Sequence, residues 1–362
     1  MKKRIESVDI LRGFTIIAMI LVNTPGSWDY VYPQLLHAEW HGLTPTDLIF
    51  PFFLFIVGIS IFFAYQNKPN TKSTYVKIII RSLKLIGLGL FLNLFLPYFP
   101  FVSELDSFRI PGVLQRIGIV FFISSILFIN FNWKTLLAIG VFILIGYWCI
   151  LGFVSFPNDV QPTFDRASNN WANYIDLNVL GKHMWQQDYD PEGLFSTFPA
   201  IVSCLSGILI GNVMSKRPKN AIVLVLISII LLGLGYLFSF WFPINKAIWS
   251  SSFVLVTSGW ATLILALIYY LTDVLNLKFG TIFKYVGMNA ITIYFLSSFI
   301  SKFFYLTKIG DNSNIHSYLF DSLFIHSSLT NKTASLLYAI AVVIFYISLG
   351  YFLFKKKIFI KV

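Results

Sequence analysis

The sequence predicts an all-α membrane protein, a helix bundle of about 10–11 transmembrane helices with its N-terminus in the cytoplasm. Hydrophobic residues make up 57% of the 362 residues and charged residues only 12%, more apolar surface than a water-soluble domain of this size can bury. The apolar residues also run in long blocks, and residues 221–238 contain neither a charge nor a proline. We therefore expect one integrated transmembrane unit.

Ten apolar segments have roughly the length of about 20 residues that a helix needs to cross the hydrocarbon layer. The ten expected spans lie at residues 9–25, 46–66, 76–96, 112–130, 134–154, 194–214, 220–241, 249–271, 285–306 and 334–354. The polar connection 307–333 carries one further apolar stretch at 318–325, for which we predict a surface or re-entrant helix.

Basic residues divide unevenly between the two sets of connections that these spans create. With a cytoplasmic N-terminus, the cytoplasmic set holds Lys2, Lys3, Arg4, Lys68, Lys72, Lys134, Lys216, Arg217, Lys219, Lys278, Lys284, Lys355, Lys356, Lys357 and Lys361. The outer set holds only Arg109, Arg166, Lys182, Lys246, Lys308 and Lys332, beside many acids in 158–192. This is the positive-inside pattern. It explains the formal net charge of +11 without a nucleic-acid partner.

The first span begins like a secretory signal peptide, but we expect it to be retained. Asp9 and Arg12 interrupt its apolar run, and no small-residue cleavage site follows. These two residues are three apart and share a helix face. They either form an ion pair or line a phosphate-binding cleft. We favour the ion pair for Asp9, and both interpretations stay open for Arg12. Cys149 and Cys204 fall within expected spans, so we predict no disulfide framework.

Five other polar residues lie inside or beside the apolar spans. Arg81 and Lys84 share one face of the third span, where snorkelling to the headgroups explains them and a grip on an anionic cofactor is the less favoured alternative. Gln115 and Arg116 follow a Pro-Gly helix entry, and internal pairing and ligand contact are equally compatible with them. Asn289 can tie two helices together or hydrogen-bond a ligand.

The densest polar cluster is HAEWHGLTPTDLIFP at residues 37–51, between two apolar runs. So many ionisable groups at the mouth of a membrane helix indicate a functional site. His37 and His41 are four apart, a spacing that can bind a metal, but no third ligand follows at a recognisable spacing and we expect no metal. A neutral imidazole is a natural general base near neutral pH, whereas a hydrogen-bonded interfacial histidine is the plainer interpretation.

Two neighbours of this cluster have alternative roles. Asp47 either orients His37 or caps the following helix, and we favour capping because an acid suits a helix N-terminus. Asn23 closes the first span just before a Thr-Pro-Gly turn. It either marks the helix end or directs its amide into the same outer cavity as His37.

Six blocks, in order along the chain, resemble the transmembrane heparan-α-glucosaminide N-acetyltransferase family and its bacterial relatives. They are RIESVDILRG at 4–13, VNTPG at 22–26 with HAEWHGLTPTDLIFPFFLFIVG at 37–58, RIPGVLQRIGI at 109–119, DPEGLFST at 190–197, INKAIWSSSFVL at 244–255 and GMNAITIY at 287–294. The resemblance covers nearly the whole chain. It implies a single transmembrane acyltransferase domain over 1–362.

The resemblance implies an activity and two principal residues. Acetyl would pass from cytoplasmic acetyl-CoA to the amine of a glucosamine-type sugar on the outer side. His37 matches the family's active histidine, because it precedes Trp40 by three residues and the Gly-Leu pair by five, and Asn23 matches its asparagine. The role is not carried to His41. Direct transfer and an acetyl-histidine intermediate both stay open.

The expected location is the bacterial inner membrane. The chain lacks the long N-terminal luminal domain of the animal lysosomal members, so we expect a smaller amino sugar or a wall-derived saccharide instead of polymeric heparan. The expected partners are this sugar and membrane lipids, and a homodimer is left open.

Candidate substrate contacts come from the residues described above. For acetyl-CoA they are Arg12, Arg81, Lys84, Gln115, Arg116 and Asn289. For the sugar they are Trp40, Asp190, Glu192, Asn245, Lys246 and Trp249, with Trp185 as a further stacking candidate. The two acids also fit a helix start, and membrane-interface belts explain most such tryptophans.

Two other functions stay as alternatives to amino-sugar N-acetylation. An amino-sugar transporter or flippase also uses intramembrane charges, but such proteins typically show paired halves with interrupted helices, which this sequence lacks. An envelope-glycan O-acetyltransferase would use the same acetyl donor and the same scaffold.

Overall fold

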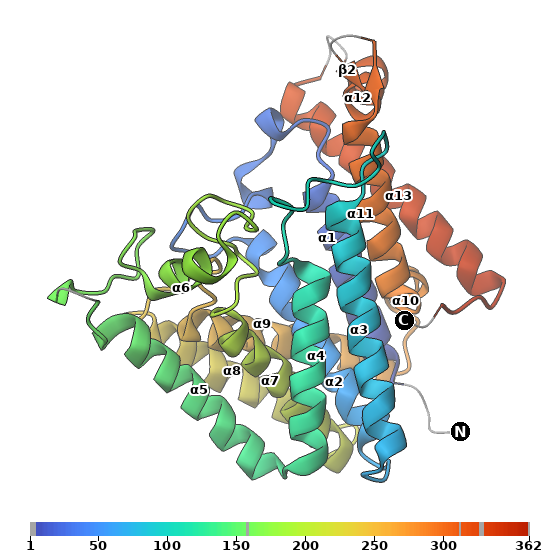
Figure 1. The fold of residues 1–362 in the computed structure, drawn as a ribbon. Helices are drawn as coiled ribbons and strands as arrows, with labels where there is room; N and C mark the ends of the chain where they lie inside the picture. The colour runs from blue at the N-terminus through green and yellow to red at the C-terminus, as the bar shows by residue number, and fades with distance from the viewer. Residues whose placement is uncertain (1–4, 157–158, 311–312, 326–328, 361–362) are drawn as a thin grey trace.

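The computed structural model describes residues 5–156, 159–310, 313–325 and 329–360, and nearly all of its regular structure is helical (Figure 1). The helices are α1 (Glu6–Asn23), α2 (Ile49–Tyr65), α3 (Lys72–Leu94), α4 (Val113–Asn130), α5 (Trp133–Phe153), α6 (Trp171–Leu180), α7 (Thr197–Lys216), α8 (Ala221–Phe238), α9 (Ser251–Tyr269), α10 (Thr281–Gly287), α11 (Ala290–Leu306), α12 (Ile315–Leu323) and α13 (Asn331–Lys355). Short 3-10 turns are η1 (Trp28–Tyr30), η2 (Pro33–Leu35) and η3 (Pro45–Leu48), and a π turn, η5 (Tyr270–Val274), extends α9. Strands β1 (Lys308–Ile309) and β2 (Ser313–Asn314) form a small antiparallel pair.

Every expected span coincides with a helix, and the ninth is divided. Seven helices in the described part of the chain are long and apolar enough to cross a membrane. They are Pro45–Tyr65, Val113–Asn130, Trp133–Phe153, Thr197–Lys216, Ala221–Phe238, Ser251–Val274 and Asn331–Lys355. This confirms a polytopic all-α membrane protein. The ninth segment breaks between α10 and α11, where Asn289 leaves the helical conformation.

Small residues allow the central helices to approach closely. A Cβ on Gly58 of α2 would lie 1.9 Å from the carbonyl oxygen of Cys204, and a Cβ on Gly207 of α7 would lie 1.9 Å from that of Phe55. The two glycines therefore fit backbone against backbone, which is how small residues pack membrane helices together. α2 and α7 form the centre of the bundle, and their side chains join the main hydrophobic core.

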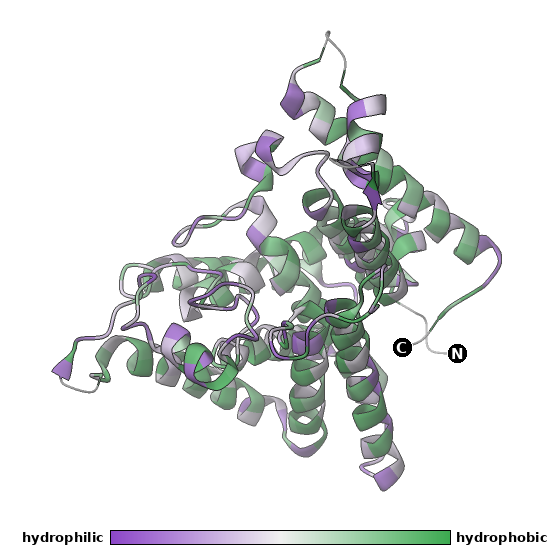
Figure 2. Cartoon of the chain, turned by 45° about the horizontal axis from the view of Figure 1, so that its top comes forward, coloured by the Kyte–Doolittle hydropathy of each residue, from purple (hydrophilic) through white to green (hydrophobic). Residues whose placement is uncertain are grey.

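The connections between the helices lie at two opposite ends of the bundle, and hydrogen bonds join them to one another at each end. At the lysine-rich end, Asn70 bonds Asn130, Ser215 bonds Gln66, and the Lys219 amide donates to the Tyr269 hydroxyl. At the other end, which we call the His37 end, the Gly42 amide donates to Ile244, the Trp40 indole to Phe164, and the Ile110 amide to His183. Hydrophobic residues dominate the long helices between these ends (Figure 2).

Two of the short helices, α6 and α12, lie away from the central packing. α6 sits in the connection between α5 and α7 at the His37 end, where no helix was expected (Figure 1). α12 occupies 315–323, which agrees with the short helix expected in the connection that follows the ninth span.

Candidate active site

The segment 37–48 is ordered by one carboxylate. Oδ2 of Asp47 accepts hydrogen bonds from the amide of Thr44 at 2.9 Å, its hydroxyl at 3.0 Å and the amide of Ala38 at 3.2 Å. The bonds to Thr44 form a capping box at the start of η3, which leads directly into α2. The Asp47 side chain is 1% exposed, so the rigid end of α2 fixes its position.

The second oxygen of Asp47 holds His37. Nδ1 of His37 lies 2.7 Å from Oδ1 of Asp47, while the imidazole is 47% exposed. Asp47 therefore both caps the helix and orients the histidine, two roles that the sequence presented as alternatives. A carboxylate at Nδ1 favours a proton on that nitrogen and leaves Nε2 as an acceptor on an accessible ring.

Lys246 completes this group from a distant part of the chain. Its Nζ lies 3.1 Å from Nε2 and 3.3 Å from Nδ1 of His37. Lys246 stands in the connection between α8 and α9, which the Gly42–Ile244 backbone bond fastens to the His37 segment. Burial lowers the pKa of Lys246, and the carboxylates of Glu192 and Asp47 oppose this effect.

His41 has a separate set of contacts. Its Nε2 lies 2.9 Å from Oδ1 of Asp165, and its Nδ1 lies 3.2 Å from Nδ2 of Asn245. Oδ1 of the buried Asn245 also accepts a bond from the Ile248 amide at 3.0 Å, so this side chain holds its own loop. The structure thus separates two histidines that stand only four residues apart in the sequence.

A buried ion-pair network adjoins Lys246. The guanidinium of Arg109 binds Asp190 through Nε at 2.8 Å and Nη2 at 2.6 Å, and it also binds Glu192. Burial lowers the pKa of Arg109, but the hydrogen bonds and charges of Asp190 and Glu192 together outweigh it and the pKa is raised. Burial raises the pKa of Glu192, but the charges of Arg109, Arg116 and Lys246 outweigh it and the pKa is lowered. Glu192 therefore links this network electrostatically to the lysine beside His37.

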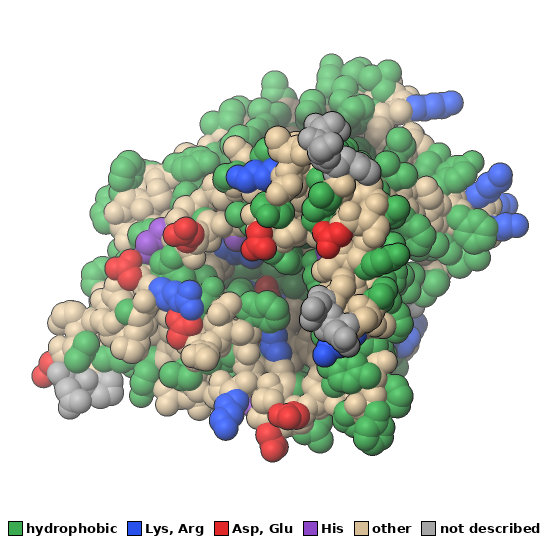
Figure 3. Space-filling view, turned by 90° about the horizontal axis from the view of Figure 1, so that it is seen from above, with side chains coloured by type: hydrophobic (Ala, Val, Ile, Leu, Met, Phe, Trp, Pro, Cys, Tyr) green, Lys and Arg blue, Asp and Glu red, His purple; other side chains and the backbone are tan. Residues whose placement is uncertain are grey.

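Asn23 lies in a pocket that shares Arg109 with this network. The pocket has a volume of about 530 Å³ and is lined by the ends of α1 and α3 and by one side of α11. Asn93, Trp185, Tyr294 and Lys302 also line it. Seen from the His37 end, the molecule is hollowed near its centre, with acidic and basic side chains around the hollow (Figure 3).

Comparison with known proteins identifies the family. The model of the heparan-alpha-glucosaminide N-acetyltransferase catalytic family matches residues 4–240, which include Asn23, His37, Asp47, Arg109 and Glu192. This chain belongs to that family. Heparan-alpha-glucosaminide N-acetyltransferase from Homo sapiens is 30% identical over 425 aligned positions covering 99% of this chain, and that from Mus musculus is 29% identical over 423. The chain spans 60% of the length of each of these relatives.

The three tryptophans proposed for sugar contact differ in how exposed they are. Trp249 is fully buried, where its indole donates to the Ser203 hydroxyl at 3.1 Å and its ring lies against Arg116. Trp40 is half-buried and donates to the Phe164 carbonyl at 2.9 Å. Trp185, by contrast, is 64% exposed and lies over Arg109 beside the Asn23 pocket. A stacking face is therefore present at Trp185 and absent at Trp249.

Three of the candidates for acetyl-CoA contact hold parts of the fold together. Gln115 donates to the Ile110 carbonyl at 3.0 Å. Nη2 of Arg116 donates to the Gly193 carbonyl at 2.8 Å and to the Ser196 hydroxyl, which braces the turn after Glu192. The Asn289 amide bonds the backbone of Ile358 and Ile360 and fastens the chain after α13.

Arg12 and Arg81 meet between α1 and α3, toward the lysine-rich end. Arg12 forms the ion pair with Asp9 at 2.8 Å and also donates to the Ser60 hydroxyl at 2.8 Å. The Arg81 guanidinium lies 4.8 Å from the centre of the Phe121 ring, close enough to Arg12 for their charges to interact, and its Nε is buried with no hydrogen-bond partner among the described residues. Lys84 is exposed on α3.

Two basic residues at the site, Arg109 and Lys302, were not among the candidates drawn from the sequence. Arg109 was assigned only to an outer connection, although it begins the RIPG helix entry on the same expected side of the membrane as the acids at 190–192. Lys302 lies in the ninth expected span, where a lysine needs a partner as much as Arg12 does. In the structure its Nζ donates to the carbonyls of Leu92 and Asn93, at 2.7 and 3.0 Å. Within the described residues no cluster of three or more histidine, cysteine, aspartate or glutamate side chains suits a metal.

Proposed function

We propose that this protein transfers an acetyl group from acetyl-CoA to the amine of a glucosamine-type sugar. The observation that carries the proposal is the imidazole of His37, held at Nδ1 by the buried Asp47 and in contact through both ring nitrogens with the ammonium of Lys246. An amine can attack a thioester only in its neutral form, so the reaction needs a base that is accessible and fixed in one tautomer. Membership of the N-acetyltransferase family supplies the reaction class.

His37 acts as the base through Nε2. As the sugar nitrogen forms its bond to the acetyl carbon, Nε2 takes the proton from that nitrogen, and Asp47 stabilises the resulting imidazolium. The carbon–sulfur bond then breaks, and the imidazolium returns the proton to the CoA thiolate. The products are the N-acetyl sugar and free CoA, so the protein ends the cycle in the state in which it began.

Lys246 acts on the carbonyl oxygen. When the amine attacks, this oxygen gains negative charge, and an ammonium beside His37 can donate a hydrogen bond to it. The lysine cannot favour binding of a protonated amine, because the two cations would repel each other. Its contribution therefore belongs to the transition state.

Asn23 and the acids of the Arg109 network receive the sugar. The Asn23 pocket offers amide and hydroxyl groups and the exposed face of Trp185, a combination that suits a hydrophilic ring. Glu192 keeps a negative charge near this pocket and near Lys246, which suits the approach of an amino sugar.

The donor approaches from the opposite end. Arg12 and Arg81 lie between α1 and α3 toward the lysine-rich end, and they suit the phosphates of acetyl-CoA. This arrangement fits a protein of the bacterial inner membrane whose lysine-rich end faces the cytoplasm.

Two histidine variants test the proposal. We expect His37→Ala to lower acetyl transfer from acetyl-CoA to glucosamine by at least about 10²-fold, because general base catalysis typically contributes 10²–10⁴-fold. His41→Ala is the matched control and should keep most of the activity, since His41 contacts Asp165 and Asn245 instead. The measurement follows N-acetylglucosamine by chromatography and free CoA by a thiol-reactive dye, with the melting temperature of each variant as a check of folding.

The same assay separates the alternatives. Near-normal transfer by His37→Ala would refute the assignment. Thiol release with N-acetylglucosamine as acceptor, which has hydroxyls but no free amine, would indicate O-acetylation. Uptake of glucosamine into vesicles without acetyl-CoA, together with no thiol release, would indicate a transporter.

A further inference from the structure

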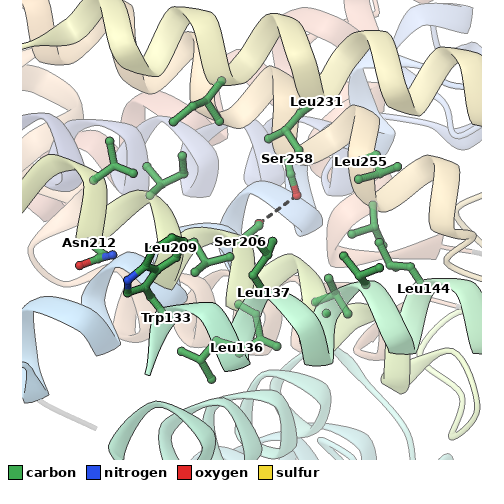
Figure 4. A pocket seen from close by; sticks show the side chains of 18 of the residues that line it. Trp133, Leu136, Leu137, Leu144, Ser206, Leu209, Asn212, Leu231, Leu255 and Ser258 are labelled. Carbon is green, nitrogen blue, oxygen red and sulfur yellow. Dashed lines mark hydrogen bonds between the residues drawn. The ribbon is translucent and has the colours of Figure 1, made fainter. Parts of the chain in front are cut away.

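An apolar groove opens between α5 and α8, and none of the candidate active-site residues lines it. α5 packs along α7, and α8 packs along α9, so α7 and α9 form the floor of the groove. It has a volume of about 570 Å³, within the range of known ligand sites. We call it the α5–α8 groove; Leu137 and Val141 line one wall, and Val223 and Leu231 line the other (Figure 4).

Away from its basic end, the described floor of the groove has no free polar group to recognise a polar ligand. Ser206 of α7 and Ser258 of α9 lie 2.9 Å apart and hydrogen-bond each other across the floor (Figure 4). The Ser206 hydroxyl also donates to the Ser203 carbonyl at 2.8 Å. Of the other floor residues only Asn212 is polar, and it lies one helical turn from Lys216 at the basic end; the rest are aliphatic, among them Leu209 and Leu255. A hydrocarbon chain is therefore the chemistry that fits this part of the groove.

One end of the groove is strongly basic. Lys216 and Arg217 line it there, and both are exposed. Nζ of Lys216 lies 5.6 Å and Nζ of Lys134 lies 5.9 Å from the ring centre of Trp133, which also lines the groove. Tryptophan is typical of headgroup depth in a membrane, so the charges stand where lipid headgroups lie. The segments that form this end, 130–134 and 214–221, contain no acidic residue.

We propose that the α5–α8 groove binds an anionic phospholipid, with its phosphate at Lys216 and Arg217 and an acyl chain along the floor toward Ser258. The positive charge of Lys216 and Arg217 favours an anionic headgroup, and the apolar floor favours a lipid acyl chain. Basic pockets between transmembrane helices on the cytoplasmic side are known to bind such headgroups. This inference does not depend on the proposed acetyl transfer, because the groove contains none of the residues placed at the candidate active site.

Native mass spectrometry of the full chain in detergent tests the headgroup end. The purified protein is titrated with phosphatidylglycerol and, separately, with phosphatidylcholine. Each basic residue near a membrane surface is worth about 1 kcal/mol toward an anionic lipid, so Lys216→Ala with Arg217→Ala should weaken phosphatidylglycerol binding about 10- to 30-fold. Lys355→Ala with Lys356→Ala removes the same charge at the end of α13 and should leave binding within about twofold.

A second pair of variants tests the apolar floor. Val141→Trp places bulk in the groove and should reduce lipid binding, whereas Phe142→Trp alters the adjacent residue, which faces away from the groove at 78% exposure. Equal binding of the two lipids, or an equal loss in both double-alanine variants, would overturn the proposal. So would a change in oligomeric state caused by Val141→Trp with lipid binding unaltered, because the groove would then cover a second copy of the chain.

Discussion

The imidazole of His37 lies between a carboxylate and an ammonium. Asp47 is buried and accepts two hydrogen bonds from Thr44 and one from the Ala38 amide, so little side-chain entropy is lost when it orients the His37 ring. Lys246 reaches the ring from a loop more than 200 residues away. The site can therefore offer a proton acceptor, Nε2 of His37, beside a hydrogen-bond donor for a developing oxyanion, the ammonium of Lys246.

Substitution of Lys246 separates a role in the transition state from a role in sugar binding. We expect Lys246→Met to lower kcat by about 10²–10³-fold, the range observed when one oxyanion donor is removed, with little change in KM for glucosamine. Lys246→Arg should recover part of kcat because it restores a donor. Steady-state kinetics with saturating acetyl-CoA measures both constants. A large rise in KM at unchanged kcat would instead assign Lys246 to uniform binding of the sugar.

The residues of the site could be predicted from sequence only where a motif carried them. The unusual polarity of their segments made His37, Asn23 and Asp47 candidates, and the resemblance to the family then favoured His37 and Asn23 for the chemistry. The partnership of His37 with Lys246 could not be found in this way, because it depends on how the loop before α9 folds back onto the segment 37–48. Arg109 was missed for the same reason, since its partners lie about 80 residues further along.

At the scale of elements, α12 and α13 hold the turn that follows Asn23. Nε2 of the buried His316 lies 3.0 Å from the Gly26 carbonyl, and Nδ1 lies 3.1 Å from the Tyr338 hydroxyl. The Gly26 amide also donates to the Ser335 carbonyl of α13 at 3.2 Å. The neutral imidazole can satisfy both contacts, with Nε2 as donor and Nδ1 as acceptor. Helices from the C-terminal part of the chain thus position a residue at the end of α1.

These contacts predict a loss of stability at mildly acid pH. Burial lowers the pKa of His316 below its usual value of 6.5, although the bond to Gly26 opposes this. As pH falls below 6.5 the unfolded chain takes up a proton that the folded protein resists, so stability falls. We expect the melting temperature to drop more between pH 7.5 and 5.5 in the wild type than in His316→Gln, when both are measured in the same detergent.

His183→Gln provides the control for this prediction, because His183 is a histidine outside the α12 contacts, bonded to the Phe108 carbonyl. Burial raises the pKa of Asp176 to about 6, which acts in the opposite direction but is common to all three proteins and cancels in the comparison. Equal pH dependence in the wild type and His316→Gln would contradict the role given to His316.

The helices themselves were largely predictable, because membrane spans have a strong compositional signature. Each expected span coincides with a helix, and the short helix in the connection 307–333 was also anticipated. Composition did not reveal the break between α10 and α11. There the side chain of Asn289 hydrogen-bonds the backbone of the chain after α13. Nor did composition reveal α6, which is only ten residues long and carries Asn173, Asp176 and Asn178; the Asp176 carboxylate accepts a hydrogen bond from the Leu194 amide of the loop before α7.

Across the whole molecule, the two ends differ in charge and in chemistry. The His37 end holds the candidate base and the acidic network, and the lysine-rich end holds most of the basic residues of the connections. Positive residues stay cytoplasmic during insertion, so this asymmetry supports the orientation that we propose. In that orientation the bundle separates the proposed cytoplasmic donor from the proposed acceptor on the other side.

Sealed vesicles of defined orientation test this arrangement. Acetyl-CoA crosses membranes poorly because of its charge. Inside-out vesicles loaded with glucosamine should therefore acetylate it when acetyl-CoA is added outside, where the lysine-rich end faces. Right-side-out vesicles given both substrates outside should release almost no CoA until detergent opens them. Labelling of a Lys356→Cys variant with an impermeant reagent reports the orientation of each preparation. Rapid transfer in intact right-side-out vesicles would mean that donor and acceptor meet at the His37 end, and the basic residues between α1 and α3 would then lose their assigned role.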